Sequence, residues 1–329
     1  MRAVYISEFG LLDNLELRQF TEPSQPENSQ VLVRVKAAGL NRADLLQVRG
    51  AYPPPTGYSP NMPGMEFAGE VSAVGGDVGK WQLGDRVFGI TAGEAQAEFL
   101  TTDGSLLARI PDNLTFAEAA AVPEAFITAH DAIFTRGDLK GGESLLIHAV
   151  GSGVGLAGLQ LAKTKGATVI GTSRTKDKLE KCNEFGLDAG ISTEAGAEFS
   201  AKSRDVTEGN GVDVVLDLVG AAYLQENLES LAIKGRLILV GLTSGRTAEF
   251  NLGMVLQKRL SIIGTVLRAR STEEKADATI KFADEVVPLL AAGKIKANLD
   301  RTFSAEDVIS AYKYLESNES FGKVVLDFG

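Results

Sequence analysis

One stretch decides the fold of this chain: Ser144-Leu145-Leu146-Ile147-His148-Ala149-Val150-Gly151-Ser152-Gly153-Val154-Gly155. Its apolar first half predicts a buried strand, and the glycines that follow predict a tight turn into a helix. Such a turn brings backbone N–H groups and a helix N-terminus close to a pyrophosphate. Residues 144–162 carry no Asp, Glu, Lys or Arg, yet their glycines favour a strand, a turn and a helix over a membrane span.

Strands and helices alternate around this stretch, from about Pro123 to Thr265. The helices predicted at Val154–Lys165 and Lys176–Phe185 are each followed by a glycine, which suits a helix end. Apolar runs predict six strands, at Leu145–Ala149, Thr168–Thr172, Ala189–Ser192, Val212–Leu216, Arg236–Val240 and Ser261–Gly264. Six strands with crossover helices predict an α/β fold with a mostly parallel, doubly wound sheet, and we assign residues 123–265 to this domain.

The segments on either side predict a second domain, made of residues 1–122 and 266–329. The first segment contains short strands that alternate apolar and polar residues, as Val31–Ala37 does, and it predicts a half-buried antiparallel barrel. In the second segment we expect a helix from about Thr272 to Ala292 and another from Ser304 to Ser317. We also expect a strand at Lys323–Asp327, and we expect this tail to return to the first segment.

Composition and charge narrow the class of protein. The 329 residues include 33 Lys and Arg against 43 Asp and Glu, and the net charge of −10 disfavours nucleic acid or an anionic membrane as a partner. One cysteine and two histidines are too few for a four-ligand zinc site built from these residue types alone. Near the N-terminus Glu8 interrupts any secretory apolar run, so we expect a cytoplasmic enzyme.

The choice of dinucleotide depends on the residues that follow the second strand of the alternating block. An acid at that strand end normally binds the ribose 2′-hydroxyl of NAD. Here the strand leads into Ser173, Arg174, Thr175, Lys176 and Lys178, with Asp177 among them. Hydroxyls and cations suit a 2′-phosphate, so the sequence predicts NADPH. The alternative is that this cluster is only a solvated first turn of a helix.

Several motifs give the chain a family resemblance. The segment Gly64-Met65-Glu66, with Gly69, Gly75 and Val78, resembles the pattern of medium-chain alcohol dehydrogenases, but Met65 and Asn41 stand where that pattern has zinc ligands. The chain is therefore similar to the zinc-free quinone oxidoreductases of the medium-chain dehydrogenase/reductase family, the zeta-crystallin-like group, over its whole length. Its motifs are most like those of the NADPH-dependent, tumour-suppressor-inducible branch: Asn41-Arg42-Ala43-Asp44-Leu45, Tyr52-Pro53-Pro54-Pro55, Pro123-Glu124-Ala125, Ser152-Gly153-Val154-Gly155 and Gly322-Lys323-Val324-Val325-Leu326.

The resemblance implies a GroES-like catalytic domain, a Rossmann NADPH-binding domain and no metal. It carries Asn41, Tyr52 and Thr128 over to the nicotinamide and substrate side, with Asn41 and Tyr52 as the catalytic residues. The other implied cofactor contacts are Ser152, Gly153 and Val154 at the pyrophosphate, Thr175 and Lys178 near the 2′-phosphate, and Gly241, Leu242, Leu267 and Arg268 along the cofactor. We also expect a homodimer, because strand Ser261–Gly264 leaves an uncovered edge.

The function predicted in this way is zinc-independent transfer of reducing equivalents from NADPH to a small-molecule quinone. Reduction of an enone or enoyl substrate on the same fold is an alternative, and a non-catalytic dinucleotide- or RNA-binding crystallin-like protein is an alternative of another class. Single residues also have plainer interpretations. Asn41 fits a helix cap and Tyr52 a loop anchor, while Arg268 and Arg270 fit a surface or dimer-edge pair.

Overall fold

The computed structural model describes residues 1–329, and the chain divides into two compact units. Unit 1 comprises Met1–Ile127 and Leu267–Gly329, and unit 2 comprises Thr128–Val266. Helix α3 (Pro123–His130) runs through the division, which falls between Ile127 and Thr128. The sequence places the same boundary at residue 123, where this helix begins.

Unit 2 contains a six-stranded parallel sheet with the strand order β10-β9-β8-β11-β12-β13. Counted along the chain this is the order 3-2-1-4-5-6 of a doubly wound sheet, which confirms the predicted fold class. The order reverses between β8 and β11, so a crevice is expected outside the carboxyl ends of these two strands. The strands are β8 (Ser144–Ile147), β9 (Thr168–Ser173), β10 (Ala189–Ser192), β11 (Val212–Asp217), β12 (Leu231–Leu239) and β13 (Ser261–Gly264).

Helices cover this sheet because each connection must cross back to start a parallel strand. Helices α4 and α5 pack on β8, β9 and β10, and α7 and α8 pack on β12. Helix α4 is followed by Gly166, whose φ of 75° is the left-handed conformation that suits a helix end. The helical elements of unit 2 are η3 (Asp131–Arg136), α4 (Gly153–Thr164), α5 (Lys176–Cys182), η4 (Asn183–Phe185), α6 (Ser200–Val206), η5 (Ala221–Tyr223), α7 (Leu224–Ser230) and α8 (Leu252–Lys258).

Unit 1 is built around the long strand β3 (Gln30–Gly39). One edge of β3 pairs with β4 along most of its length, while the other edge pairs first with β6 and then with β15. This division of one edge between two partners, together with register shifts in the β3–β4 pair, bends the sheet. The remaining strands are β1 (Arg2–Ile6), β2 (Leu15–Gln19), β4 (Glu66–Val74), β5 (Arg86–Ile90), β6 (Phe99–Asp103), β7 (Leu107–Arg109), β14 (Leu299–Ser304) and β15 (Lys323–Asp327).

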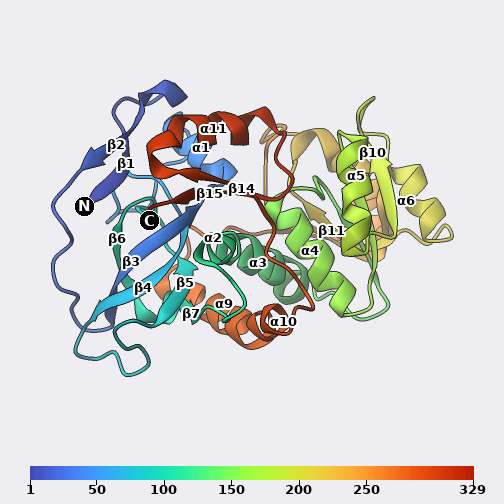
Figure 1. The fold of residues 1–329 in the computed structure, drawn as a ribbon. Helices are drawn as coiled ribbons and strands as arrows, with labels where there is room; N and C mark the ends of the chain where they lie inside the picture. The colour runs from blue at the N-terminus through green and yellow to red at the C-terminus, as the bar shows by residue number, and fades with distance from the viewer. The chain divides into compact units, whose positions relative to one another are not determined.

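The C-terminal tail returns to unit 1, as the sequence predicts. Strand β15 pairs antiparallel with β3, so the red end of the chain lies beside a blue strand in Figure 1. Two details differ from the sequence prediction. The tail contains an additional strand, β14, that pairs parallel with β15 and makes the sheet mixed. The helix expected over 272–292 is interrupted after Glu285, where Pro288 lies at the start of the next helix.

The helical elements of unit 1 flank this bent sheet. They are η1 (Leu12–Asn14), α1 (Arg42–Val48), η2 (Gly104–Leu106), α2 (Phe116–Ala120), α9 (Thr272–Glu285), α10 (Val287–Ala291), η6 (Ala305–Asp307) and α11 (Val308–Ser317). The apolar face of α11 packs Val308, Tyr312 and Leu315 into the core that the strands form. None of the helices in either unit combines the length and apolarity needed to cross a bilayer.

Candidate functional site

The glycine-rich turn joins β8 to α4. Ser152 is the N-cap of α4, and its Oγ accepts a hydrogen bond from the Gly155 N–H at 3.1 Å. A Cβ at Gly155 would lie 2.5 Å from Ala149 O and 2.7 Å from Val150 Cα, so only glycine lets the helix start this close to the strand end. Because Ser152 caps α4 through its side chain, it stabilises a helix start of the kind that can bind a pyrophosphate.

The other strand ends of unit 2 meet at the same edge of the sheet. Strand β9 ends at Ser173, β11 ends at Asp217, and Gly241 follows β12. The Gly241 N–H donates to Asp217 O at 3.1 Å, and a Cβ at Gly241 would lie 2.6 Å from Leu218 O. The predicted cofactor residues of unit 2 from three strands therefore share one edge, where close-packed backbone suits a dinucleotide.

The predicted 2′-phosphate cluster lies at the end of β9 and the start of α5. The Ser173 Oγ accepts a hydrogen bond from the Thr175 N–H at 3.2 Å, so this turn is held by its own hydroxyl. Arg174, Thr175 and Asp177 are exposed, whereas Lys178 is half-buried. The structure brings the four predicted residues of this cluster together and leaves the acid Asp177 in solvent. The sequence did not decide where Asp177 lies.

A buried polar network links three strand ends below this edge. The His148 ring nitrogens lie 2.9 Å from Thr172 Oγ1 and 2.5 Å from Asn227 Oδ1, and Asn227 donates to Asp217 Oδ2 at 3.0 Å. Burial lowers the pKa of His148, so the ring is neutral at neutral pH. Since Asp217 also accepts from the Gly220 N–H, the partners of this network lie inside the protein and hold the strand ends in place.

In unit 1 the Asn41 side chain is held between two charged groups. Asn41 lies between β3 and α1, and its Nδ2 donates to Glu66 Oε1 at 2.9 Å. Its Oδ1 accepts from Lys323 Nζ at 2.6 Å, and Nζ lies 2.5 Å from the same Glu66 oxygen. Glu66 begins β4 and Lys323 begins β15, so two strands and one helix start meet here. The Asn41 amide is thus committed to Glu66 and Lys323, and it is more than a helix cap.

Two further carboxyl groups lie at this cluster. The Glu124 N–H donates to Glu66 Oε2 at 2.9 Å. Burial, and then the neighbouring Glu66 carboxylate, raise the pKa of Glu124 to about 8, so this carboxyl is mostly protonated at neutral pH. Asp44 accepts from the Asn41 N–H at 2.7 Å, and its burial raises its pKa to about 6. The unit therefore holds an acid that keeps its proton beside a charged pair.

Tyr52 and Arg268 lie together in unit 1. The Arg268 guanidinium lies 5.1 Å from the centre of the Tyr52 ring, and its Nη1 donates to Tyr52 O at 3.0 Å. Its other donors bind Ala92 O at 2.7 Å and Gln47 Oε1 at 2.5 Å. The interpretation of Arg268 as a surface or dimer-edge residue is wrong, because the side chain is only 4% exposed and anchors the Tyr52 loop to helix α1. Burial raises the pKa of Tyr52, so its hydroxyl remains a donor.

The remaining predicted residues lie at two kinds of place. Two lie where the chain passes from one unit to the other, and three lie just after strands β8 and β12. Thr128 is the first residue of unit 2 and is half-buried, whereas Leu267 is buried and begins the C-terminal segment of unit 1. Gly153 and Val154 open α4, and Leu242 is exposed after Gly241. Their assignments to the cofactor stay predictions.

The side chains at positions 41, 65 and 66 do not fit a zinc ion. Asn41 offers an amide and Met65 a buried thioether, both poor zinc ligands, while Glu66 is already paired with Lys323. No group of three or more His, Cys, Asp or Glu side chains in residues 1–329 is arranged to hold a metal ion. The donor set at these positions therefore differs from that of a zinc dehydrogenase.

Sequence reasoning missed Lys323 and Glu124 as members of the site. Both lie in motifs that carry the family resemblance, yet their roles depend on side chains far away in the chain. In both cases the sequence shows a charged residue in an otherwise apolar segment. Glu124 is the only acid between Ala119 and Ile127, and Lys323 precedes the apolar run Val324–Leu326. A charge in an otherwise buried segment predicts a paired or functional group.

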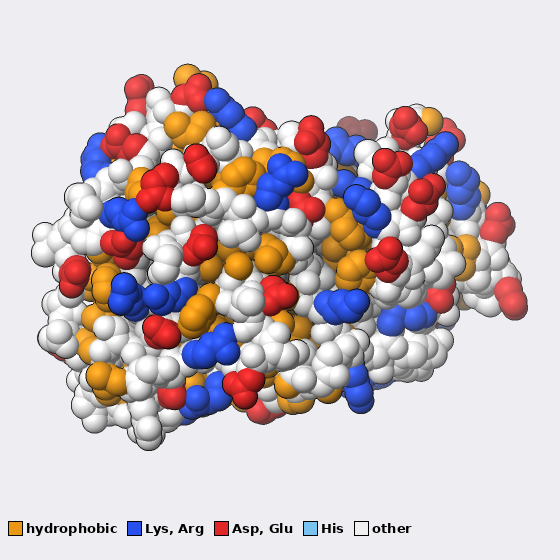
Figure 2. Space-filling model, viewed as in Figure 1, with side chains coloured by type: hydrophobic (Ala, Val, Ile, Leu, Met, Phe, Trp, Pro, Cys, Tyr) orange, Lys and Arg blue, Asp and Glu red, His pale blue; other side chains and the backbone are white.

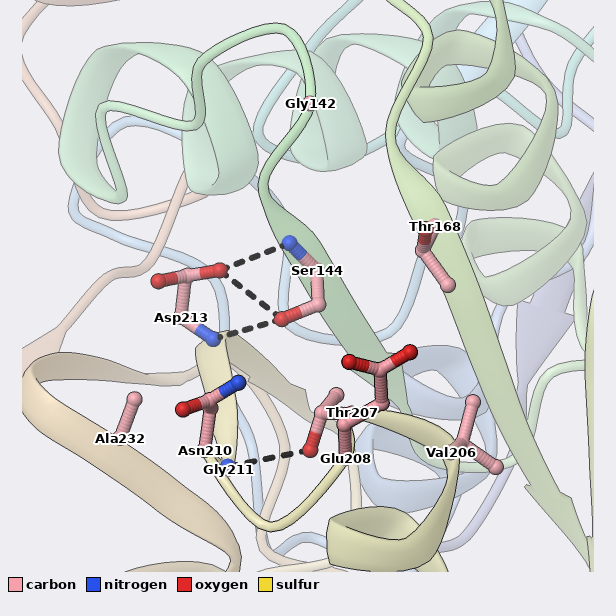
Figure 3. A pocket seen from close by; sticks show the side chains of 10 residues that line it. All are labelled: Gly142, Ser144, Thr168, Val206, Thr207, Glu208, Asn210, Gly211, Asp213 and Ala232. Carbon is pink, nitrogen blue, oxygen red and sulfur yellow. Dashed lines mark hydrogen bonds between the residues drawn. The ribbon is translucent and has the colours of Figure 1, made fainter.

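A pocket of about 270 Å³ lies at the opposite edge of the unit 2 sheet, near the amino ends of its strands (Figure 3). Ser144 N–H and Oγ both donate to Asp213 Oδ2 at 2.8 Å, and Thr207 Oγ1 accepts from the Gly211 N–H at 3.0 Å. None of the predicted cofactor residues lines this pocket; those of unit 2 lie at the carboxyl edge of the sheet.

Comparison with known families matches both halves of the chain. Residues 27–131 match the alcohol dehydrogenase GroES-like domain, and residues 153–283 match the family described as zinc-binding dehydrogenase. The quinone oxidoreductase of Pseudomonas aeruginosa is 31% identical over 328 residues, which cover 99% of each chain. Erythronolide synthase EryA2 of Saccharopolyspora erythraea is 35% identical over 96% of this chain, but the chain spans only 8% of that protein's length.

Solved structures agree with these relatives. The Escherichia coli quinone oxidoreductase complexed with NADPH superimposes with a TM-score of 0.90, at 29% identity and full coverage of both chains. The CurK enoyl reductase superimposes with a TM-score of 0.88, at 28% identity, covering 100% of this chain and 99% of its own. Matched domains, strand order and full-length relatives agree, and the chain belongs to the quinone oxidoreductase family of the medium-chain dehydrogenases/reductases.

Proposed function

We propose that this chain is an NADPH-dependent quinone oxidoreductase that works without zinc. The observation that carries the proposal is the Asn41 amide, which Glu66 and Lys323 hold in place. Asn41 stands where the zinc dehydrogenase pattern has a metal ligand. The Pseudomonas aeruginosa relative is named a quinone oxidoreductase, and the Escherichia coli structure contains NADPH. Both names support the substrate and the cofactor proposed here.

The carboxyl edge of the unit 2 sheet is proposed as the cofactor site. The residues fit a dinucleotide because Gly155 and Gly241 leave no room for a Cβ, and because Ser152 caps the helix start that faces a pyrophosphate. Arg174 and Lys178 supply the positive charge that a 2′-phosphate requires. When bound, NADPH supplies hydride to the acceptor.

The acceptor oxygen is proposed to receive hydrogen bonds from unit 1. The Asn41 amide has a second N–H beyond the one that binds Glu66, and the Tyr52 hydroxyl keeps its proton. A quinone is a strong electron acceptor, so these donors stabilise the charge that develops on its oxygen without a Lewis acid. Water is able to deliver the proton. Glu124 is a second group in this unit that holds a proton at neutral pH.

The test compares NADPH oxidation with 1,4-quinones, enones and enoyl thioesters. We expect the quinones to be reduced fastest, with NADPH preferred over NADH, no stoichiometric zinc and no effect of chelators. Tyr52→Phe and Asn41→Ala should each lower quinone turnover, because a well-aligned hydrogen-bond donor that is lost costs roughly 2 to 4 kcal/mol in the transition state. Neither variant should change NADPH affinity. Tyr314→Phe is the control, because that hydroxyl binds Asp300 away from Asn41. Wild-type turnover in both variants contradicts the assignment.

A second candidate is reduction of an activated C=C bond, and the comparisons supply its support. The CurK and JamJ enoyl reductases have this fold, at 28% and 26% sequence identity to this chain. Faster turnover of enones or enoyl thioesters than of quinones would select it. RNA binding is disfavoured by the net charge of −10, and Figure 2 shows acidic and basic side chains interspersed on the visible face. A non-catalytic dinucleotide-binding protein is disfavoured by the presence of both Asn41 and Tyr52.

A further inference from the structure

The ammonium group of Lys323 has an acceptor for each of its three N–H donors. Its Nζ donates to Leu40 O at 2.5 Å and to Asn41 Oδ1 at 2.6 Å, and it lies 2.5 Å from Glu66 Oε1. The Lys323 side chain is 5% exposed and the Glu66 side chain is fully buried. An ammonium has three N–H donors, so each donor has its own acceptor and the group has a single position.

This fixed group determines which way the Asn41 amide faces. A primary amide offers one acceptor oxygen and two N–H donors. Lys323 takes the oxygen and Glu66 takes one N–H, which leaves only an N–H of the half-buried Asn41 side chain for a ligand. Rotating the amide by 180° would place its NH₂ group against the ammonium and its oxygen against the carboxylate. Both contacts would then be repulsive.

We propose that Lys323 is a positioning residue, which fixes Asn41 so that its remaining N–H faces the acceptor oxygen. The inference rests on the proposed function, since it assigns a partner to Asn41 in the same site. The backbone supports it independently, because the Leu40 N–H donates to Val324 O at 2.8 Å and so sets Lys323 beside Asn41. Without Lys323 only Glu66 still disfavours the rotated amide, so the N–H that faces the acceptor oxygen is held less firmly.

The experiment is a double-mutant cycle in which Lys323→Met is introduced into wild type and into Asn41→Ala. If Lys323 acts through Asn41, quinone kcat falls about 10- to 100-fold in the wild-type background, and less than about twofold once the amide is absent. NADPH affinity should be unchanged in all four proteins. Equal loss of kcat in both backgrounds would overturn the proposal, because Lys323 would then act independently of Asn41.

A second variant covers the case in which Lys323→Met fails to fold, since it leaves Glu66 buried without a counter-charge. Lys323→Met combined with Glu66→Gln removes both charges. Positioning predicts that this protein regains stability while turnover stays low, whereas recovery of turnover would show that Lys323 only balances Glu66. The matched control is Lys258→Met, because Lys258 Nζ also binds three oxygens, all of them backbone carbonyls of unit 2.

Failure of the proposed function is read from the wild type alone. If wild type reduces enones and not quinones, the cycle is run with the enone it reduces. If it reduces neither, the orientation is measured directly by NMR of protein labelled with ¹⁵N-asparagine, with Asn41→Ala identifying the signal. One Asn41 amide proton should be protected by Glu66, and Lys323→Met should change this signal. An unchanged signal would show that Lys323 does not orient the amide.

Discussion

Replacing Gly155 by alanine tests the cofactor turn by itself. In most helix positions this change stabilises the fold by about 0.5 to 1 kcal/mol. At Gly155 the new Cβ would lie 2.5 Å from Ala149 O and 2.7 Å from Val150 Cα, and both atoms are backbone of the turn. Backbone cannot move aside as a side-chain end can, so the start of α4 must shift away from β8.

The expected cost follows from this overlap. Overpacking costs about 1 to 3 kcal/mol and helix propensity returns about 0.5 to 1 kcal/mol, so we expect a net loss of about 1 kcal/mol and at most about 2.5 kcal/mol. Because the shifted helix start faces the pyrophosphate, NADPH affinity should fall at least about tenfold, which corresponds to about 1.4 kcal/mol. Urea unfolding measures the first quantity and titration calorimetry with NADPH measures the second.

Gly158→Ala is the matched control on the same helix. Its Cβ would meet Leu216 Cδ2 at 3.2 Å and Ile147 Cδ1 at 3.4 Å, which are the ends of flexible side chains. We expect unchanged NADPH affinity and a stability within about 1 kcal/mol of wild type. If Gly155→Ala were as stable as wild type and bound NADPH equally well, the close approach of turn and strand would not form the cofactor site.

Three further predictions concern charge and assembly. The pKa of Glu124 is raised to about 8 in the folded state, so between pH about 4.5 and about 8 the folded chain holds a proton that the unfolded chain has lost. The free energy of unfolding should therefore fall as the pH rises through this range. Urea unfolding should show a flatter dependence on pH in Glu124→Gln. Arg174→Ala and Lys178→Ala should each weaken NADPH binding about tenfold with little change for NADH, and equal losses for both cofactors would contradict a 2′-phosphate contact. Ile262, 38% exposed on edge strand β13, should lie at the predicted homodimer contact, so Ile262→Lys should yield a monomer by light scattering, and a wild type that is monomeric at micromolar concentration would contradict the homodimer.

Local pattern in the sequence predicted most of the fold. The apolar run at 144–149 and the glycines after it predicted β8, the turn and the start of α4. They could do so because strand burial and tight turns show in the pattern of neighbouring residues. The glycine after Lys165 marked the end of α4 for the same reason. The predictions that failed concerned single elements. Pro288 interrupts the long C-terminal helix, and β14 was missed because its exposed polar residues lack the alternation of a half-buried strand.

The sequence also identified Asn41, through the family pattern, but not what holds it. Its partner Lys323 is 282 residues away, and Gln47 and Arg268, which anchor the Tyr52 loop, are 221 residues apart. Hydrophobic periodicity shows which face of a strand is buried but not which strand pairs with it. Only the pairing of β15 with β3 places Lys323 beside Asn41, and only the tertiary structure supplies the burial and the neighbouring Glu66 carboxylate that raise the pKa of Glu124. The sequence alone determined the two domains and the glycine-rich turn, because these depend on local pattern, and the tertiary structure decided the charges that surround Asn41.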